Sequence, residues 1–362
     1  MVKQALMDNI DKKTKDAVYL LTRMIEIPSF SREESAVADL VFDTLQKDGL
    51  EPKRRGNNVW CVDPHYDAQK PTILFDAHLD TVKPVSGWTR EPFRATVEGD
   101  CIFGLGSNDD GASVVSLMQV YKTLIDTCQS YNLVYSASCE EEVSGKDGLE
   151  SVLPLFPPIH VGLVGEPTEM QPAIAEKGLM VLDVIAHGRA GHAARDEGDN
   201  AIYRALEDIS WIRDYCFSQV SPLLGSVKMT VTEVHAGTQH NVIPDQCSFV
   251  VDARSNEFYS NKDLYDYICL HVSSEVKARS FRLNSSCIDM GHPLVLKAME
   301  IGRVPFGSPT LSNQALLPFP SMKMGPGCSS RSHTADEYVR ISEIDQAIRL
   351  YLELLDGLKL EK

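Results

Sequence analysis

Short apolar segments alternate with amphipathic helical patterns through the first half of this 362-residue chain. Apolar runs typical of strands lie at 58–62, 72–75, 132–137 and 160–164, and helical patterns lie at 12–27, 33–47 and 112–125. Strands that alternate with helices pair in parallel, because each helix carries the chain back across the sheet. The pattern predicts an α/β fold, a mostly parallel sheet with helices on both faces, whose functional side chains follow the carboxyl ends of the strands.

A different pattern begins at about Gly178. Strand, helix, strand, strand and helix are then expected in that order, at 179–186, 200–219, 227–234, 248–253 and 262–277. This order is typical of a small α+β unit. After it, a strand at 321–324 and a helix at 342–358 return to the first pattern. We therefore expect one domain formed by residues 1–177 and 288–362, with residues 178–287 inserted into it.

The charge balance disfavours two classes of partner. Lys and Arg total 35 against 51 for Asp and Glu, a net charge of −16, which repels nucleic acid and anionic membranes. No apolar run reaches the roughly 18 residues of a membrane span, and the charged first residues are unlike a signal peptide. The nine cysteines form no CxxC pair, so neither a disulfide framework nor a thiolate zinc site is expected. We expect a cytoplasmic protein with reduced thiols.

The expected strand at 72–75 continues directly into a histidine and two acids. Alternate side chains of an extended chain share a face, so Asp76, His78 and Asp80 can point the same way. A metal-bound imidazole usually donates its other N–H to a carboxylate, which fixes its orientation. His78 fits such a ligand. A loop histidine beside solvated acids is the simpler alternative.

The glycine-rich turn Gly104–Gly111 is similar to a dinucleotide-binding turn, but it reads GxGxxxxG where that turn reads GxGxxG. Asp109 and Asp110 lie where a pyrophosphate would approach, and their charge would repel it. A nicotinamide-dependent oxidoreductase is therefore the weaker interpretation. Carboxylate ligands for a cation are the stronger one.

Acids also follow the third and fourth expected strands, and a second histidine lies in a late loop. These residues are the triplet Glu140–Glu142, Glu166 and His333. A solvated charge run and an ordinary loop histidine are the alternatives. If four successive strand ends carry His78, Asp109, the triplet and Glu166 to one edge, these groups form a metal site. Nitrogen and oxygen donors without sulfur favour Zn²⁺, Co²⁺ or Mn²⁺.

Five motifs together resemble the di-zinc aminoacylase/carboxypeptidase metallohydrolase family over nearly the whole chain, namely DAHLDTV, GLGSNDDGA, CEEE, GEPTE and SRSHTADEYV. The resemblance implies a zinc-exopeptidase-like catalytic domain with an inserted α+β lid and dimerisation domain. It implies two Zn²⁺ ions per chain, with Co²⁺ or Mn²⁺ as substitutes. It also implies a homodimer formed through the lid and a cis peptide after Asp109.

The metal ligands implied by this resemblance are His78, Asp109, Glu142, Glu166 and His333. Asp109 would bridge both ions, His78 and Glu166 would bind one of them, and Glu142 and His333 the other.

Three catalytic roles are also implied by the resemblance. Asp80 would orient His78, Glu141 would be the general base, and His192 of the lid would stabilise the oxyanion, often from the other subunit. A shift of one residue in the triplet would make Glu140 the base.

Two further lid residues match positions that bind substrate in the family. They are Asn241 and Arg254, and a guanidinium can bind a carboxylate through two hydrogen bonds. The simpler alternatives are a turn residue before Pro244 for Asn241, a surface ion pair for Arg254, and a plain loop histidine for His192.

The resemblance implies hydrolysis of the amide bond of a small N-acyl amino acid. Similarity is greatest to the acetylornithine deacetylases, so we expect N-acetyl-L-ornithine, or N-succinyl-L-ornithine, as substrate in arginine biosynthesis. A dipeptidase, a carboxypeptidase or a succinyl-diaminopimelate desuccinylase with the same metal site is the alternative, and a silent binding protein is a third interpretation. The family's DxKG motif reads Asp109-Asp110-Gly111-Ala112 here. The missing lysine disfavours the desuccinylase and aminoacylase branches.

Overall fold

The computed structural model describes residues 9–195 and 197–361, which form two compact units. Unit 1 contains the chain up to Ile174, Ile288–Phe306 and the chain from Ser312 onward. Unit 2 contains Ala175–Cys287 and the short segment Gly307–Leu311. The catalytic role expected for the first part and the lid or dimerisation role expected for the second remain predictions.

A mixed sheet forms the centre of unit 1, in the strand order β1-β2-β6-β3-β7-β17-β8. Its strands are β1 (Lys53–Arg55), β2 (Asn58–Val62), β3 (Thr72–His78), β6 (Asn132–Ser138), β7 (Val161–Val164), β8 (Ala173–Glu176) and β17 (Ser321–Lys323). The four central strands β6, β3, β7 and β17 run parallel, whereas β1, β2 and β8 pair antiparallel. The predicted α/β class with a mostly parallel central sheet is confirmed.

The last strand of this sheet continues into unit 2. The second half of β8 pairs there with β15 (Ser286–Cys287), and β16 (Phe306–Ser308) also pairs with β8. The chain therefore leaves unit 1 and enters unit 2 along β8, and it re-enters unit 1 after β15.

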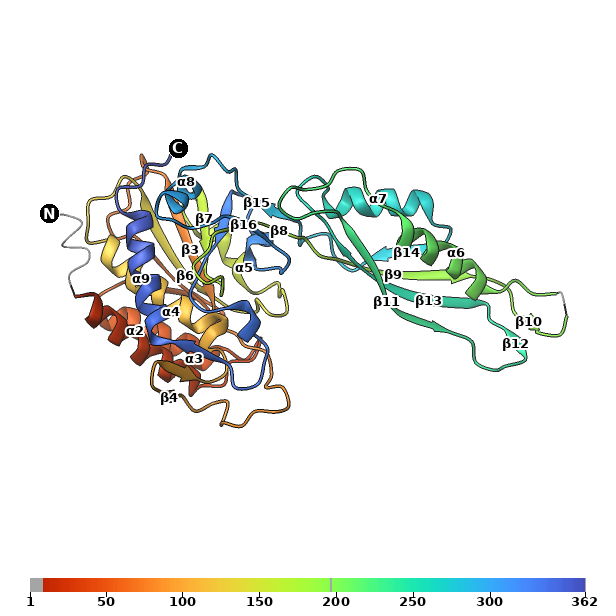
Figure 1. Ribbon diagram of the computed structural model, residues 1–362, viewed down its shortest axis with the longest axis horizontal. Coiled ribbons are helices and arrows are strands. Elements are labelled where there is room, and N and C mark those ends of the chain that lie inside the picture. Colours follow the sequence, from red (N-terminus) through yellow and green to blue (C-terminus); the bar gives the residue numbers. More distant parts are fainter. Residues whose placement is uncertain (1–8, 196, 362) are drawn as a thin grey trace. The chain divides into compact units, whose positions relative to one another are not determined.

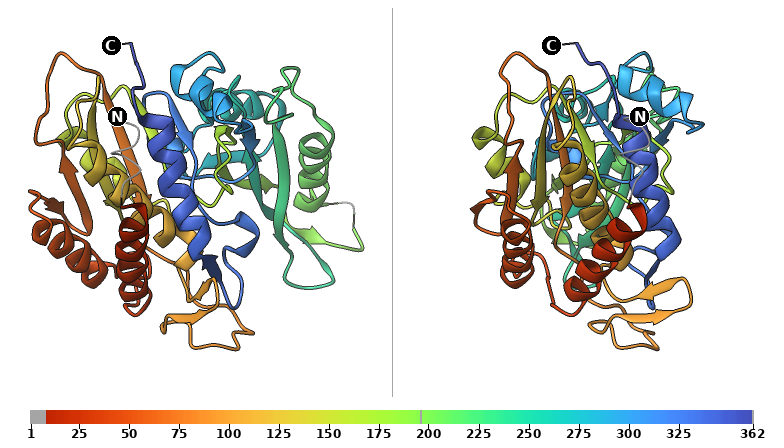
Figure 2. Two further views of the ribbon diagram at one scale, coloured as in Figure 1. Left: turned by 60° about the vertical axis from the view of Figure 1, so that its left-hand side comes forward. Right: turned by 90° about the vertical axis from the view of Figure 1, so that its left-hand side faces the viewer.

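Helices cover the central sheet, and the alternation of side chains along β6 shows how. The Tyr135 hydroxyl donates to the carbonyl oxygen of Val114 in α4 at 3.0 Å, whereas its neighbour Val134 packs with Trp60 and Phe156 in a cluster that includes α5. On the α4 side, α2, α4 and α9 contact one another (Figures 1 and 2). The helices of unit 1 are α2 (Ile10–Ile25), α3 (Ser35–Lys47), α4 (Ala112–Leu124), α5 (Leu149–Val152), α8 (Pro293–Glu300) and α9 (Ile341–Leu355).

A second, small sheet of unit 1 has the order β18-β5-β4. Its strands are β4 (Thr96–Glu98), β5 (Cys101–Phe103) and β18 (Tyr338–Arg340). Each strand has three residues, too few to show a period in the sequence, and this sheet is not predicted. Its register pairs Tyr338 with Phe103, which brings the residues before β18 beside the glycine-rich turn after β5.

Unit 2 is built on an antiparallel sheet of order β11-β13-β9-β14. Alternate residues of β9 and β13 are buried against α6 and α7, which explains the period of two in both strands. The elements are β9 (Met180–His187), α6 (Ala201–Asp214), β11 (Lys228–Ala236), β13 (Gln246–Arg254), α7 (Asn261–His271) and β14 (Glu275–Ala278). A separate two-stranded pair joins β10 (Gly191–His192) to β12 (Val242–Ile243).

Two predicted helices of unit 2 are too long. The helix expected at 262–277 ends at His271, because buried Asp208 accepts the backbone N–H groups of Ser273 and Ser274 at 3.0 Å each, and β14 follows. The helix expected at 200–219 ends at Asp214, after which Tyr215 is extended and its ring stacks on Trp211. The C-terminal end of each helix is set by a contact with another element or with an aromatic ring. Helical periodicity in the sequence does not predict such contacts.

Two structural findings bear on the composition. None of the nine cysteines, all of which lie in the described part of the chain, is placed in a disulfide. In the described part of the chain, every helix is too short or too polar to cross a membrane.

Candidate active site

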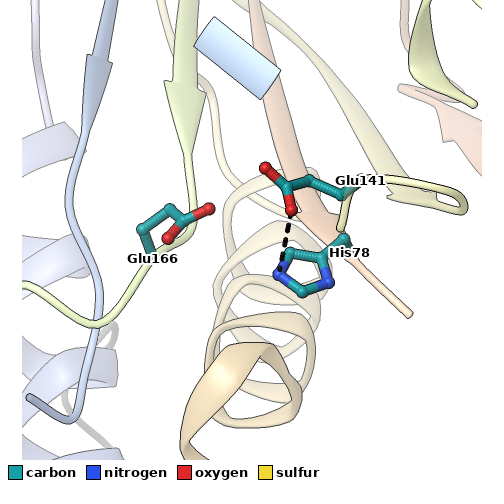
Figure 3. Close-up of side chains that lie close together, drawn as sticks. All are labelled: His78, Glu141 and Glu166. Carbon is teal, nitrogen blue, oxygen red and sulfur yellow. Dashed lines mark ion pairs between the residues drawn. The ribbon is translucent and has the colours of Figure 1, made fainter. Parts of the chain in front are cut away.

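Three neighbouring parallel strands of unit 1 bring reactive side chains to one edge of the sheet. β3 ends at His78, the triplet Glu140–Glu142 follows β6, and Glu166 follows β7. Since β3 pairs with β6 on one side and with β7 on the other, the three strand ends meet. His78, Glu141 and Glu166 lie close together there, each carried by a different strand end (Figure 3).

Asp109 reaches the site from elsewhere, which corrects the expectation that four strand ends of one sheet converge. It lies in the turn between β5 of the small sheet and α4. Gly106 has a φ of +74° in this turn, and a Cβ there would lie 2.5 Å from the Cγ2 atom of Thr81, so the turn needs glycine. The peptide bond between Asp109 and Asp110 is cis, as the resemblance implies.

His78 is held on both sides of its ring. Nδ1 lies 2.9 Å from the carbonyl oxygen of Asp80, which can only accept, so Nδ1 carries the hydrogen. The Asp80 carboxylate, expected to orient the ring, lies 3.6 Å from Nδ1. Nε2 faces Oδ1 of Asp109 at 3.1 Å and Oε2 of Glu141 at 4.0 Å. A ring nitrogen and carboxylate oxygens so placed repel each other unless they share a proton or a metal ion.

His333 forms a second pairing on the other side of Asp109. Its Nε2 lies 3.0 Å from Oε1 of Glu142 and 3.7 Å from Oδ2 of Asp109. The two oxygens of Asp109 thus face two different histidines. Potential ligand atoms lie within 4.8 Å of one another in two overlapping groups, His78 with Glu141 and Glu166, and His78 with Asp109 and Glu142.

The carboxylates of this cluster are crowded and largely shielded from solvent, with the side chains of Glu142, Glu141 and Asp109 10%, 11% and 12% exposed. Burial, and then repulsion from neighbouring acids, raises the pKa of Glu141 well above its usual value, against the opposing charge of His78. Burial likewise raises the pKa of Glu166, against the charge of Lys323. A cation among these oxygens would stabilise their ionised forms. The donor set, imidazole and carboxylate without thiolate, fits Zn²⁺, Co²⁺ or Mn²⁺.

Glu140 points away from both groups. Its backbone φ is +58°, and its Oε2 atom lies 3.6 Å from Nε of Arg32. A Cβ at Gly145 would lie 1.7 Å from that oxygen, so the absence of a side chain at Gly145 makes room for it. The geometry therefore favours Glu141 and Glu142 as the two acids of the triplet that face the site.

Buried carboxylates hold the loops of the site, and two of them are missed by the sequence analysis. Asp80 accepts the backbone N–H groups of Glu141 and Glu142 at 2.9 and 3.1 Å. Glu34 accepts that of Glu140 at 3.1 Å, and Glu337 accepts three from the turn around Asp109. Glu337 stands inside the motif SRSHTADEYV, which could have marked it, whereas no motif surrounds Glu34.

The three expected lid residues all lie in unit 2, at two separate places. His192 in β10 is paired with β12, and the N–H of Ala193 donates to the carbonyl oxygen of Asn241 at 3.0 Å, so His192 and Asn241 are neighbours. Arg254 is the last residue of β13, a nine-residue strand about 26 Å long. Within one chain, Arg254 therefore lies far from His192. Their membership of the active site remains a prediction.

Arg254 lies in a cluster of positive charge. Its Nε and Nη2 atoms donate to Asp252 at 2.7 and 3.0 Å, so the ion pair named as the simpler alternative is present. Lys228 is its register partner on β11. Burial, followed by the charges of Lys228 and Arg254, lowers the pKa of Lys177. Three cations and one acid therefore gather at this end of the unit 2 sheet.

The chain is similar to several known proteins. The profile described as Peptidase family M20/M25/M40 matches residues 74–357. A Mycobacterium tuberculosis protein provisionally named succinyl-diaminopimelate desuccinylase is 28% identical, over 94% of this chain and 98% of its own. The Corynebacterium glutamicum succinyl-diaminopimelate desuccinylase is 25% identical, over 94% and 96%. A Bacillus subtilis structure described as a dinuclear metal-binding peptidase of the M20 family shares the fold, with a TM-score of 0.70 at 16% identity over 96% and 100%.

Proposed function

Because the chain belongs to the peptidase family M20/M25/M40, we propose that it is a two-metal hydrolase that cleaves the amide bond of an N-acyl amino acid, N-succinyl-L,L-diaminopimelate first among them. Membership of this family identifies the chain as a hydrolase of the peptidase and amidohydrolase type. The metal content, the roles of the individual residues and the substrate belong to the proposal.

The observation that carries the proposal is the position of Asp109. One of its oxygens faces His78 and the other faces His333, and further carboxylates surround both histidines. A carboxylate that presents each oxygen to a different imidazole suits a bridge between two divalent cations. A single buried ion pair would need neither the second histidine nor the additional acids.

In this proposal Asp109 binds both ions, His78 and Glu166 bind one, and Glu142 and His333 bind the other. We propose Zn²⁺ as the native ion, with Co²⁺ and Mn²⁺ as substitutes, since the donors are nitrogen and oxygen. The similar Bacillus subtilis structure is described as dinuclear, which supports two sites. When bound, such ions supply Lewis acidity, which polarises a carbonyl group and makes water a better nucleophile.

Glu141 is the proposed general base. Its carboxylate lies close to His78 and Glu166 (Figure 3). It accepts a proton from the attacking water as oxygen bonds to the amide carbon. It then passes that proton to the amine nitrogen as the carbon–nitrogen bond breaks, so one carboxylate serves both half-reactions. Asp80 supports this role by fixing the backbone of Glu141.

Unit 2 is proposed to act as the lid and as the dimer interface. In the described residues β11 pairs only with β13, so its outer edge is open to a strand of a second copy. His192 is proposed to stabilise the oxyanion from the partner subunit, and Asn241 to bind substrate beside it. The long separation of Arg254 from His192 within one chain supports two subunits contributing to one site.

The succinyl group is favoured over the acetyl group by two observations. The two sequence relatives reported above are named succinyl-diaminopimelate desuccinylase, one of them provisionally, so the expectation of N-acetylornithine and of arginine biosynthesis finds no support in these names. The cluster of Lys177, Lys228 and Arg254 offers positive charge to a substrate with several carboxylates. N-acetyl-L-ornithine carries one carboxylate and makes less use of such a cluster.

A substrate panel tests the proposal. Zinc-loaded protein is incubated with N-succinyl-L,L-diaminopimelate, N-acetyl-L-ornithine or a dipeptide, each with and without a chelator, and the released amine is measured. We expect chelator-sensitive cleavage of the succinylated substrate. Cleavage of only N-acetyl-L-ornithine or only the dipeptide would contradict the proposed substrate. It would still agree with the assignment of the chain as a hydrolase.

A further inference from the structure

Glu337 is a buried acid to which the proposed reaction gives no role. Its side chain is 2% exposed, and both carboxylate oxygens accept hydrogen bonds from the turn that carries Asp109. Oε1 accepts the backbone N–H groups of Asn108 and Asp109, each at 2.9 Å, and Oε2 accepts that of Gly106 at 3.0 Å. One carboxyl group thus accepts three backbone N–H groups of this turn.

The place of Glu337 follows from the register of the small sheet. β18 begins at Tyr338, which pairs with Phe103 at the end of β5, so the residue before β18 faces the residue after β5. The N–H of Gly104 accordingly donates to the carbonyl oxygen of Glu337 at 3.0 Å. The two strands therefore fix the backbone of Glu337 at the start of the turn.

The same turn is tied to the segment that carries His333. Oδ1 of Asn108 accepts the N–H of Cys328 at 2.9 Å, and its Nδ2 donates to Oγ of Ser332 at 3.2 Å. Glu337 lies four residues beyond His333 and binds the same turn. The distances from Asp109 to His78 and to His333 thus depend on the bonds made by Glu337 and Asn108.

From these contacts, and resting on the proposed two-metal function, we infer that Glu337 is a positioning residue that fixes Asp109 between the two cation sites. It touches neither substrate nor metal. Its effect is on metal affinity, because a bridging carboxylate binds two ions only while its backbone is held. Substitution of groups that orient metal ligands typically weakens metal binding by about 10- to 100-fold.

The test compares Glu337→Gln with the matched control Asp336→Asn. The side-chain amide introduced by Glu337→Gln would place an N–H donor against a backbone donor and keep a single acceptor oxygen. The neighbour Asp336 instead accepts from Thr89 and Arg90, at 3.0 and 3.1 Å from their backbone nitrogens. Zn²⁺ is titrated into chelator-stripped protein against a chromophoric competitor, and the Co²⁺ absorption spectrum is recorded for each variant.

We expect Asp336→Asn to bind two ions as tightly as the wild type does. Glu337→Gln should bind at least one of the two ions about 10- to 100-fold more weakly than the wild type. Excess metal should restore much of the variant's kcat, which a merely structural defect would not allow. Two ions bound by folded Glu337→Gln with wild-type affinity and an unchanged Co²⁺ spectrum would overturn the inference. So would an equal loss in Asp336→Asn.

Hydrogen exchange on the wild-type protein covers the case in which Glu337→Gln does not fold. The amides of Asn108 and Asp109 should exchange slowly even without metal, and rapid exchange of both would overturn the inference. Failure of the proposed function would be recognised by a different result. In that case the wild-type protein itself would bind no metal or hydrolyse no amide.

Discussion

Asp80 accepts a hydrogen bond from the backbone N–H of Glu141 at 2.9 Å, so the acid that follows His78 also fixes the proposed general base. The same carboxylate accepts the N–H of Glu142 at 3.1 Å and the hydroxyl of Ser31 at 2.7 Å. Meanwhile the carbonyl oxygen of Asp80 holds the ring of His78. One residue thus connects the ends of β3 and β6.

Replacement of Asp80 by Asn should lower kcat by about 10- to 100-fold. Asparagine keeps the size of the side chain but has one acceptor oxygen for three donors, so the loop of Glu141 and Glu142 loses part of its support. Steady-state kinetics at saturating metal measure the effect. Asp63→Asn, which alters a surface turn at His65, is the control, and an equal kcat in both variants would contradict the role of Asp80.

Replacement of Glu141 by Gln should lower kcat by about 10²- to 10⁴-fold while metal binding is kept, because the amide cannot accept the proton of water. Metal content by elemental analysis and turnover are measured on the same sample. Glu140→Gln is the matched control, since Glu140 faces Arg32 and lies outside the cluster. Normal turnover by Glu141→Gln with both ions bound would remove the base assignment.

Removal of metal should destabilise unit 1. The largely shielded Glu141 and Glu166 then lose the cation that offsets their repulsion, and desolvation with like charges raises the pKa of each. Restoring Zn²⁺ to about 100 times its Kd should raise the free energy of unfolding by about 2.7 kcal/mol. Thermal unfolding with and without chelator measures this, and an unchanged Tm would contradict a metal site in the folded protein.

Replacement of Lys228 by Gln should raise KM for the succinylated substrate by about two- to fivefold, since exposed charge pairs are weak. KM for an N-acetyl amino acid should change less, because that substrate lacks the second carboxyl group. Lys277→Gln, on β14 at the opposite edge of the unit 2 sheet, is the control. Equal effects of both substitutions on both substrates would show that Lys228 has no part in specificity.

The sequence predicts the central strands well because they are buried and flanked by acids or histidine. The apolar run at 72–75 leads into His78, and the structure extends β3 to that histidine. Asp109 is misplaced by the same reasoning, because β5 has three residues and belongs to another sheet. The residues that surround Asp109 are brought there by the pairing of β5 with β18, whose residues lie more than 200 positions apart in the sequence. Local periodicity carries no information about such a pairing.

The supporting residues are the hardest to predict. Glu34 lies outside every motif, and Glu337 lies in a motif that is singled out for His333. The importance of both acids lies in the backbone N–H groups they accept from distant loops. The end of α7 at His271 is similarly decided by Asp208 of α6. Such contacts are visible only after the chain has folded.

The most direct measurement of the two-metal account is the rate of N-succinyl-L,L-diaminopimelate hydrolysis as Zn²⁺ is added stepwise to chelator-stripped protein. We predict no activity without metal, and a rate that rises until two equivalents per chain are bound. Glu141→Gln should bind the same two equivalents and stay nearly inactive. Full hydrolysis by metal-free protein, or a rate indifferent to added metal, would contradict the account.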